Sequence, residues 1–177
     1  MSATMAATTF AATFAAAFPA TIHASAVLVG PRAVLIRGPS GAGKSQLAFA
    51  LIEAARAGRL RFARLIGDDR VRIETHHGRL LVRPAPALAG LIELRGIGIC
   101  RLPFEAMGVV CLVVDLAAND AARMPEPSAA ATDVNGIVLP RLGVAPGHDA
   151  LATVMACLTM PARPPVKAPV VATHHPP

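Results

Sequence analysis

The sequence contains no tryptophan and no tyrosine, and its aromatic content of 3% consists of six phenylalanines. Proteins that bind single-stranded nucleic acids commonly stack the bases on aromatic side chains. The scarcity of these side chains argues against such a function. The basic residues are also spread along the chain and do not concentrate on one helix. We therefore expect no nucleic-acid partner.

Cysteine is also scarce: Cys100, Cys111 and Cys157 are widely spaced and lie in apolar surroundings. Metal sites usually contain close pairs such as C-x₂-C, and a disulfide framework usually needs an even number of cysteines. We interpret the three cysteines as small core residues of a protein that works inside the cell. A cytoplasmic location is expected.

Long hydrophobic runs are absent as well, although hydrophobic residues make up 54% of the chain and the mean hydropathy is +0.52. A membrane-spanning helix needs about 18 or more consecutive apolar residues, and no segment provides them. Alanine, which buries little area, accounts for 37 of the 177 residues and explains much of the average. We expect no contact with a membrane and a single domain with additional chain at its ends.

The two ends of the chain differ in composition from the rest. Residues 1–22 contain nine alanines and no charged side chain, and residues 160–177 contain six of the 16 prolines. We expect both ends to be disordered. Ala24-Ser25-Ala26 is similar to a signal-peptidase site, but no basic segment precedes it. The domain is expected at residues 23–159, which hold all 11 acidic and 15 of the 17 basic residues, a net charge of +4.

Hydrophobic periodicity predicts an α/β fold for this domain. Helical spacing of apolar residues predicts one helix over residues 47–55, ending at Gly58, and a second over residues 150–158. Short apolar runs predict strands, and the last of them is apolar enough to be buried on both faces. These strands are expected at residues 27–29, 33–36, 62–66, 71–74, 80–83, 91–94 and 109–114.

One motif carries specific chemical information. The pattern G-x-x-x-x-G-K-[ST] is satisfied by Gly38-Pro39-Ser40-Gly41-Ala42-Gly43-Lys44-Ser45, between a predicted strand and a predicted helix. Its glycines let successive backbone N–H groups turn toward phosphate oxygens, and the helix N-terminus adds a partial positive charge. Lys44 is expected to neutralise the β- and γ-phosphates of ATP, and the Ser45 hydroxyl to hold Mg²⁺. All eight residues are candidates for nucleotide binding.

Acidic residues follow this motif at two places. Asp68 and Asp69 end the strand predicted at residues 62–66, where they are expected to face the same crevice as the glycine-rich loop. One carboxylate there can bind a metal ion and the other can act as a base, although a solvated turn is an alternative. Glu93 lies inside an apolar strand, where burial is costly unless the carboxylate is paired or bound to metal. Arg95 is the local candidate for a partner, so an ion pair and a metal ligand both stay open.

The sequence resembles the catalytic domain of HPr kinase/phosphorylase. The resemblance rests on the glycine-rich loop about 15 residues after His23, on Asp68-Asp69-Arg70-Val71, and above all on Ile92-Glu93-Leu94-Arg95-Gly96-Ile97-Gly98-Ile99. It covers residues 23–159 and implies a P-loop-containing kinase core with a mixed sheet flanked by helices. Full-length members have a further N-terminal domain, and this chain resembles the short form without it.

The resemblance implies an ATP- and Mg²⁺-dependent kinase that phosphorylates a serine of the phosphocarrier HPr, a regulatory step of the phosphotransferase system. Many members also reverse the reaction with inorganic phosphate. The resemblance implies that Asp69, in the pair with Asp68, is the catalytic base and that Glu93 is a second magnesium ligand. His23 matches an active-site histidine, and Arg123 matches an arginine that stabilises the transferring phosphoryl group. Members are hexamers, so a homo-oligomer is expected.

Two positions depart from the family pattern. Gln46 stands where glutamate is typical, and His148 replaces the arginine of a P-G-R-N segment associated with the reverse reaction. These departures weaken the expectation of phosphorolysis and leave open a nucleotide-sensing regulatory module with little catalysis. A small-molecule kinase is another alternative. It usually needs a basic lid, and residues 117–133 contain Arg123 as their only basic side chain.

Overall fold

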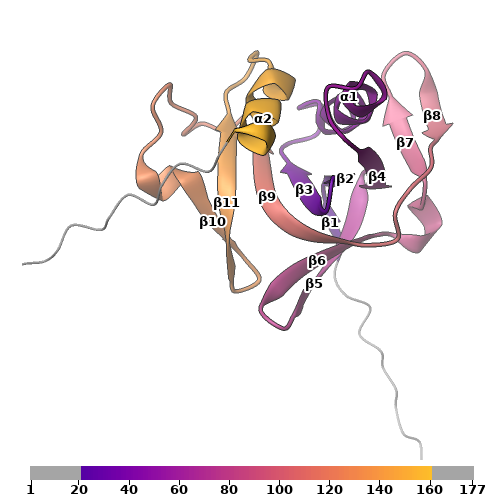
Figure 1. The fold of residues 1–177 in the computed structure, drawn as a ribbon, viewed down its shortest axis with the longest axis horizontal. Coiled ribbons are helices and arrows are strands. Elements are labelled where there is room, and N and C mark those ends of the chain that lie inside the picture. Colours follow the sequence, from indigo (N-terminus) through magenta and orange to yellow (C-terminus); the bar gives the residue numbers. More distant parts are fainter. Residues whose placement is uncertain (1–20, 161–177) are drawn as a thin grey trace, which may run out of the picture.

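The structure, a computed structural model, describes residues 21–160 (Figure 1). The first strand begins at Thr21, two residues before the expected domain boundary at His23. The rest of the alanine-rich leader and nearly all of the proline-rich tail lie outside the described residues. Within residues 21–160, no helix is long and apolar enough to cross a membrane.

The domain is built on a mixed sheet with two α-helices. The helices are α1 (Lys44–Arg56) and α2 (Ala150–Thr159), with short 3₁₀ turns at η1 (Pro86–Leu88) and η2 (Pro127–Ala130). The strands are β1 (Thr21–His23), β2 (Ser25–Val29), β3 (Arg32–Arg37), β4 (Ala63–Gly67), β5 (Arg70–His76), β6 (Arg79–Pro84), β7 (Leu91–Leu94), β8 (Gly98–Arg101), β9 (Gly108–Leu116), β10 (Ala131–Val134) and β11 (Ile137–Val144).

The strand order explains why several loops meet at one edge. β9 lies in the centre, parallel to β3 on one side and to β11 on the other. β2 is antiparallel to β3, and β4 is antiparallel to β2. β3 and β4 therefore run in the same direction with β2 between them, so their carboxyl ends and the beginning of β2 share one edge of the sheet.

The predicted helices and strands are all present, and the α/β fold with a mixed sheet is confirmed. The β10–β11 hairpin was not predicted, although it has a recognisable signal. Asn135 and Gly136, which join the two strands, both have positive φ values, 53° and 79°. An Asn-Gly pair in this conformation is typical of a tight hairpin turn.

The two faces of the sheet are covered differently. Both helices pack on one face, where Leu47 and Leu51 of α1 and Val154 of α2 join a core with β2, β3, β4 and β9. The core on the other face contains no helix residue and consists of strand residues, including Val71, Leu80 and Val113, together with Ala24. Figure 1 shows β5 and β6 extending away from the helices. The helices therefore flank the sheet on one side only.

A second, two-stranded sheet is formed by β7 and β8. Ile92 of β7 is buried in the core that contains α1, and Leu94 packs against that core. Ile97 in the turn between the strands and Ile99 of β8 are exposed by 75% and 74%. This hairpin thus has one attached face and one apolar face that meets solvent.

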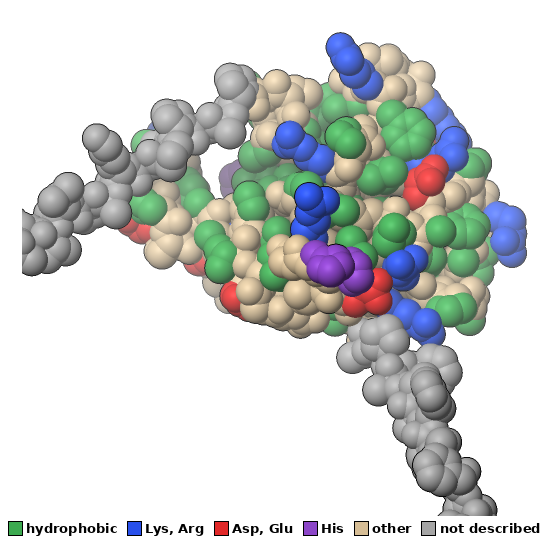
Figure 2. Space-filling model, turned by 60° about the horizontal axis from the view of Figure 1, so that its bottom comes forward, with side chains coloured by type: hydrophobic (Ala, Val, Ile, Leu, Met, Phe, Trp, Pro, Cys, Tyr) green, Lys and Arg blue, Asp and Glu red, His purple; other side chains and the backbone are tan. Residues whose placement is uncertain are grey.

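The surface corrects one prediction about the cysteines. Cys100 and Cys111 are partly buried, whereas Cys157 is exposed on α2, so the expectation of a core residue is wrong for Cys157. On the face drawn in Figure 2, lysine and arginine side chains are separated by hydrophobic and acidic ones. That face carries no continuous basic stripe.

Candidate active site

The P-loop, residues 38–45, connects β3 to α1. Gly38, Gly41 and Gly43 have positive φ values of 147°, 79° and 91°, which favour glycine. A Cβ atom on Gly38 would also lie 2.9 Å from the carbonyl oxygen of Leu116. Gly43 caps α1 without a side-chain hydrogen bond, and the first turn contains no acidic residue. The N–H groups at this helix end are therefore free of side-chain competition for an anion.

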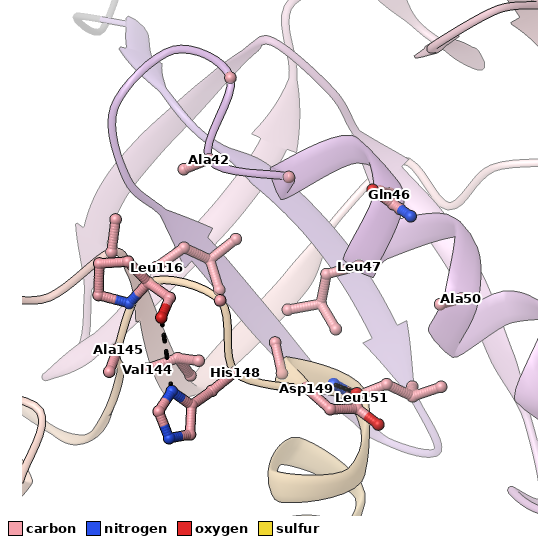
Figure 3. A pocket seen from close by; sticks show the side chains of 16 residues that line it. Ala42, Gln46, Leu47, Ala50, Leu116, Val144, Ala145, His148, Asp149 and Leu151 are labelled. Carbon is pink, nitrogen blue, oxygen red and sulfur yellow. Dashed lines mark hydrogen bonds between the residues drawn. The ribbon is translucent and has the colours of Figure 1, made fainter.

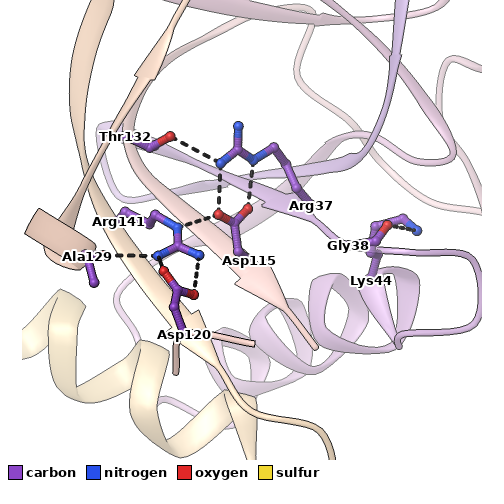
Figure 4. Close-up of polar contacts among 8 residues, drawn as sticks. All are labelled: Arg37, Gly38, Lys44, Asp115, Asp120, Ala129, Thr132 and Arg141. Atoms are coloured by element: carbon purple, nitrogen blue, oxygen red, sulfur yellow. Dashed lines mark hydrogen bonds and ion pairs between the residues drawn. The ribbon is translucent and has the colours of Figure 1, made fainter. Parts of the chain in front are cut away.

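Lys44 is held across the P-loop by the loop's own backbone (Figure 4). Its Nζ atom donates hydrogen bonds to the carbonyl oxygens of Gly38, the contact drawn in Figure 4, and of Pro39, each at 3.0 Å. The residue is 6% exposed. Burial lowers the pKa of Lys44 below its ordinary value, while the charges of Asp68 and Asp69 act in the opposite direction. The side chain of Lys44 is thus fixed close to two carboxylates.

Asp68 is the centre of the site. It is 3% exposed, and its Oδ1 atom accepts hydrogen bonds from the Oγ atoms of Ser25, at 2.5 Å, and Ser45, at 2.9 Å. Its Oδ2 atom accepts a hydrogen bond from the backbone N–H of Glu93 at 3.2 Å. One buried carboxylate therefore ties together β2, α1 and β7.

Ser25 is a site residue that the sequence analysis missed. It is the first residue of β2, which runs opposite to its neighbours and so begins at the edge where β3 and β4 end. The residue is fully buried. A serine at the start of an apolar strand was the available signal, because a buried hydroxyl needs a hydrogen-bond partner.

Asp69 is exposed, unlike its buried neighbour Asp68. Its φ value is 61°, and its side chain is 59% exposed. Its Oδ1 atom lies 3.1 Å from Nδ1 of His23 at the end of β1. The backbone carbonyl of Asp69 accepts a hydrogen bond from Ala24 N–H at 3.2 Å. The structure therefore brings His23 and Asp69 together at the rim of the site.

The exposure of Glu93 differs from the prediction. The sequence predicted a buried carboxylate in an apolar strand, but the structure exposes this residue. The reason is that β7 belongs to the small hairpin and not to the main sheet, so Glu93 faces solvent while Ile92 faces the core. Among the ion pairs of residues 21–160, none joins Glu93 to Arg95. The backbone of Glu93 reaches Asp68, and its carboxylate is left available.

Arg123 is not brought to the other candidates. It is exposed in the segment between β9 and η2, and in the described part of the chain no hydrogen bond or ion pair connects it to the P-loop, Asp68 or Asp69. The same segment is anchored by Asp120, which accepts hydrogen bonds from Arg141 at 2.7 and 2.9 Å. The contact of Asp120 with Arg141 thus anchors the segment between β9 and η2 three residues before Arg123. No contact of this kind holds the guanidinium group of Arg123 in the described part of the chain.

Arg141 belongs to a charged network beside the P-loop (Figure 4). Asp115, at the end of β9, accepts hydrogen bonds from Nε and Nη2 of Arg37, at 2.7 and 2.8 Å, and from Nε of Arg141, at 2.5 Å. Burial acts to raise the pKa of Asp115, but the hydrogen bonds and the positive charges of Arg37 and Arg141 together outweigh it and hold this pKa below its ordinary value. Since Arg37 directly precedes Gly38, the network fixes the strand end that enters the P-loop.

We expect Asp115→Asn to lower the free energy of unfolding by about 2 kcal/mol at pH 7, because it leaves Arg141, whose side chain is 13% exposed, with fewer charged partners. A depressed carboxyl pKa stabilises the fold above the unfolded pKa of about 4 and loses this effect as the pH falls through the folded value. The difference between the two proteins in urea unfolding should therefore shrink below about pH 4.

The matched control is Glu74→Gln. Glu74 forms an ion pair with Arg83 at 3.1 Å in which both side chains are at least 40% exposed. Such a pair contributes less than about 1 kcal/mol. If the two variants lose equal amounts of unfolding free energy, the Asp115 network stabilises the fold no more than an exposed ion pair does.

Comparison with known proteins gives the family. The family described as HPr Serine kinase C-terminal domain matches residues 15–108, more than half of the chain. The chain belongs to this family. The resemblance recognised in the sequence is thereby confirmed, and its most specific motif, residues 92–99, lies inside the matched region.

Individual proteins of the HPr kinase family are also similar to this chain in sequence. HPr kinase/phosphorylase of Mycoplasma mycoides subsp. mycoides is 39% identical over 77 residues, which are 44% of this chain and 22% of that protein. The Levilactobacillus brevis protein of the same name is 41% identical over 80 residues, which are 45% of this chain and 24% of that protein. The matches thus span about a quarter of the length of these relatives.

The fold extends the similarity further along the chain. The solved structure of the Hpr(Ser) kinase/phosphatase from Coxiella burnetii superimposes with a TM-score of 0.63 and 25% sequence identity. The superposition covers 78% of this chain and 93% of that one. The HPr kinase fold therefore includes elements beyond residue 108, where the family match ends.

Proposed function

We propose that this protein transfers the γ-phosphoryl group of ATP, in the presence of Mg²⁺, to a serine of an HPr-like phosphocarrier. The observation that carries the proposal is the convergence of Lys44, Ser45, Asp68 and Asp69 at the mouth of the P-loop. Membership of the HPr kinase family supports the choice of acceptor. Since ATP is a cytoplasmic metabolite, we also propose a cytoplasmic site of action, and family resemblance favours a homo-oligomer.

The residues present fit a magnesium-dependent site. Mg²⁺ is usually held by one or two carboxylates and hydroxyls together with substrate phosphates, without an all-protein cage. Within residues 21–160 no three His, Cys, Asp or Glu side chains form a metal-binding cluster, whereas Ser45 and Asp68 place two oxygen donors at 2.9 Å from each other. Ser45 and Asp68 would hold the ion, and Glu93 would be its second carboxylate. When bound, Mg²⁺ neutralises charge on the phosphates.

Phosphate binding and proton transfer are assigned to different residues. The N–H groups of the P-loop and the ammonium of Lys44 bind the phosphates. Asp69 takes the proton from the hydroxyl of the acceptor serine. The serine oxygen then forms a bond to the γ-phosphorus of ATP as the bond between this phosphorus and the β-phosphate oxygen breaks, and ADP is released. His23, 3.1 Å from the Asp69 carboxylate, orients that base. Arg123 stays a prediction as the residue that stabilises the transferring group.

Two features favour a protein acceptor over a small molecule. The proposed base, Asp69, is 59% exposed, so a serine on the surface of another protein can reach it. The β7–β8 hairpin, whose Glu93 N–H binds Asp68, also presents the exposed Ile97 and Ile99. Neighbouring exposed apolar side chains beside a reactive group are typical of a protein contact.

The proposal is tested by incubating the full chain with the organism's own HPr-like phosphocarrier, ATP and Mg²⁺, followed by mass spectrometry of both proteins. We expect one phosphoryl group on a serine of the carrier and none when Mg²⁺ is removed with a chelator. A carrier in which that serine is replaced by alanine is the control. ATP binding without transfer to the carrier would contradict the proposal and favour a nucleotide-sensing module, and ATP turnover on small metabolites would favour a small-molecule kinase.

A further inference from the structure

One guanidinium group holds both ends of the loop that contains Arg123. This loop, residues 121–128, is flanked by Asp120 and Ala129. Arg141 donates hydrogen bonds from Nη1 to Oδ2 of Asp120, at 2.7 Å, and to the carbonyl oxygen of Ala129, at 3.0 Å (Figure 4). Its Nη2 atom donates a hydrogen bond to Oδ1 of Asp120 at 2.9 Å. The two ends of the Arg123 loop are therefore held together by Arg141.

The base of the Arg123 loop is joined to the strand that enters the P-loop. Oδ2 of Asp115 accepts hydrogen bonds from Nε of Arg141, at 2.5 Å, and from Nη2 of Arg37, at 2.8 Å. Arg37 is the last residue of β3 and directly precedes Gly38 of the P-loop. β3 and β9 are parallel and pair Arg37 with Asp115, so both strands end at the same edge of the sheet. One carboxylate thus connects the base of the loop with the start of the P-loop.

The chain that leads from β9 into the Arg123 loop also lies beside the P-loop. Leu116 and Ala117 line a pocket of about 570 Å³ together with residues 41–43 of the P-loop (Figure 3). The N–H group of Ala118 donates a hydrogen bond to the carbonyl oxygen of Val144 at 3.0 Å, which fixes the chain immediately after this point. The Arg123 loop consequently starts next to the residues that bind phosphate in the proposed function.

Between its fixed ends the Arg123 loop is exposed. Residues 122–128 are all exposed, and the side chain of Met124 is exposed by 77%. Pro125 and Pro127 each fix a backbone φ angle, which limits the conformations of the loop. A loop with joined ends and a restricted backbone loses less entropy when one of its side chains binds a ligand. The contacts of Arg141 therefore lower the cost of bringing Arg123 to a ligand at the P-loop.

Arg123 has the chemistry that phosphoryl transfer requires beside the P-loop. Negative charge on the transferring phosphoryl group is stabilised by an arginine in many phosphotransferases. Lys44 is bound by the P-loop backbone, and Arg37 and Arg141 are both bound by Asp115. Of these four basic side chains, Arg123 alone has no hydrogen bond or ion pair in the described part of the chain. Its guanidinium group is therefore available to the substrate.

We propose that Arg141 is a positioning residue for phosphoryl transfer, because its contacts with Asp120 and Ala129 keep Arg123 within reach of the phosphoryl group that moves from ATP to the acceptor serine. The proposal rests on the proposed function. It gives Arg141 and Asp120 no contact with ATP or with the carrier. Substitutions of these two residues should therefore slow the transfer step and leave the binding of ATP unchanged.

The test is a double-mutant cycle with Arg123, measured as single-turnover phosphorylation of the HPr-like carrier by the full chain at saturating Mg²⁺-ATP. Arg141→Lys keeps a positive charge beside Asp115 but cannot hold both ends of the loop. We expect it to lower the rate constant about 10-fold or more, and Asp120→Asn to lower it about three- to tenfold. The ATP concentration for half-maximal rate should stay within about twofold of wild type.

The second part of the cycle shows whether Arg141 acts through Arg123. Arg123→Ala is expected to lower the rate constant about 10²-fold or more. Adding Arg141→Lys or Asp120→Asn to Arg123→Ala should cause almost no further loss, because the loop then has no guanidinium group to position. A residue that only stabilises the fold would cause the same loss with and without Arg123.

Two substitutions outside the Arg123 loop are the matched controls. Arg83→Lys makes the same change in the exposed ion pair with Glu74, and Asp133→Asn makes it in the turn between β10 and β11. Both should keep the wild-type rate constant. Urea unfolding checks that each variant is folded in the assay. The Asp120 side chain is 53% exposed, so Asp120→Asn decides the test if Arg141→Lys does not fold.

The outcomes separate this proposal from the proposed function. Wild-type rate constants in Asp120→Asn and Arg141→Lys would overturn the positioning role, and so would equal losses with and without Arg123 or a wild-type rate constant in Arg123→Ala. A higher requirement for ATP at an unchanged rate constant would also overturn it. In each of these cases the wild-type protein still phosphorylates the carrier, so the proposed function stands. If the wild-type protein does not phosphorylate the carrier, both are wrong. Losses that disappear in the Arg123→Ala background support the positioning role.

Discussion

Replacing Asp69 by asparagine is expected to lower phosphoryl transfer to the carrier by about 10²- to 10⁴-fold, while ATP binding stays within about threefold of wild type. The amide cannot take the proton of the acceptor serine, which is the step assigned to Asp69. The residue is exposed at the rim of the site, and Asp68 keeps its three hydrogen bonds. The measurement is single-turnover phosphorylation of the carrier, followed by mass spectrometry, together with a calorimetric titration of ATP.

Asparagine is the informative substitution because of the backbone at this position. Asp69 has a φ of 61°, a conformation that asparagine adopts more easily than alanine does. A loss of activity in Asp69→Asn therefore reports on the carboxylate and not on backbone strain. Asp133→Asn serves as control, since Asp133 is also exposed and accepts a hydrogen bond from Gly136 N–H in a turn outside the site. Full activity of Asp69→Asn would remove Asp69 as the base.

Replacing Asp68 by alanine is expected to reduce both stability and magnesium-dependent nucleotide binding. The change leaves the buried hydroxyl of Ser25 and the N–H of Glu93 without their acceptor, so we expect the free energy of unfolding to fall by about 2 to 4 kcal/mol. It also removes the carboxylate that we propose to hold Mg²⁺ together with Ser45. The Mg²⁺ concentration needed for half-maximal ATP binding should rise about 10-fold or more.

The two effects of Asp68→Ala can be measured separately. Urea unfolding gives the stability, and a titration of Mg²⁺ at fixed ATP gives the metal dependence below the unfolding transition. Ser25→Ala is a useful comparison, because it removes one hydrogen bond to Asp68 and keeps the carboxylate and Ser45. We expect it to lower stability with a much smaller effect on the Mg²⁺ requirement. An unchanged Mg²⁺ requirement in Asp68→Ala would restrict Asp68 to a structural role.

Much of the site could be predicted because its residues are close in sequence to strong local signals. The P-loop is encoded by eight consecutive residues, and the three glycines that need positive φ values are part of the motif itself. The Asp68-Asp69 pair directly follows β4. Its location at the end of a strand could therefore be predicted as soon as β4 itself was predicted. Local signals of this kind do not depend on how distant segments pack.

Other parts of the site depend on packing between distant segments. Ser25 lies 43 residues from Asp68 in sequence and meets it only because the antiparallel β2 is inserted between β3 and β4. Glu93 is exposed because β7 leaves the main sheet to pair with β8. The contact of Arg37 with Asp115 spans 78 positions and follows from the parallel pairing of β3 with β9. Strand order cannot be obtained from periodicity, which gives each strand but not its neighbours.

The sequence by itself determined the α/β fold, the phosphate loop, the acidic pair and the family, because each is written in short consecutive segments. Tertiary structure alone decided which residues surround Asp68, that Glu93 is exposed, and that residues 144–151 lie across a pocket from the P-loop. Those outcomes depend on strand order and on contacts between segments far apart in the chain, whose energies no local pattern contains.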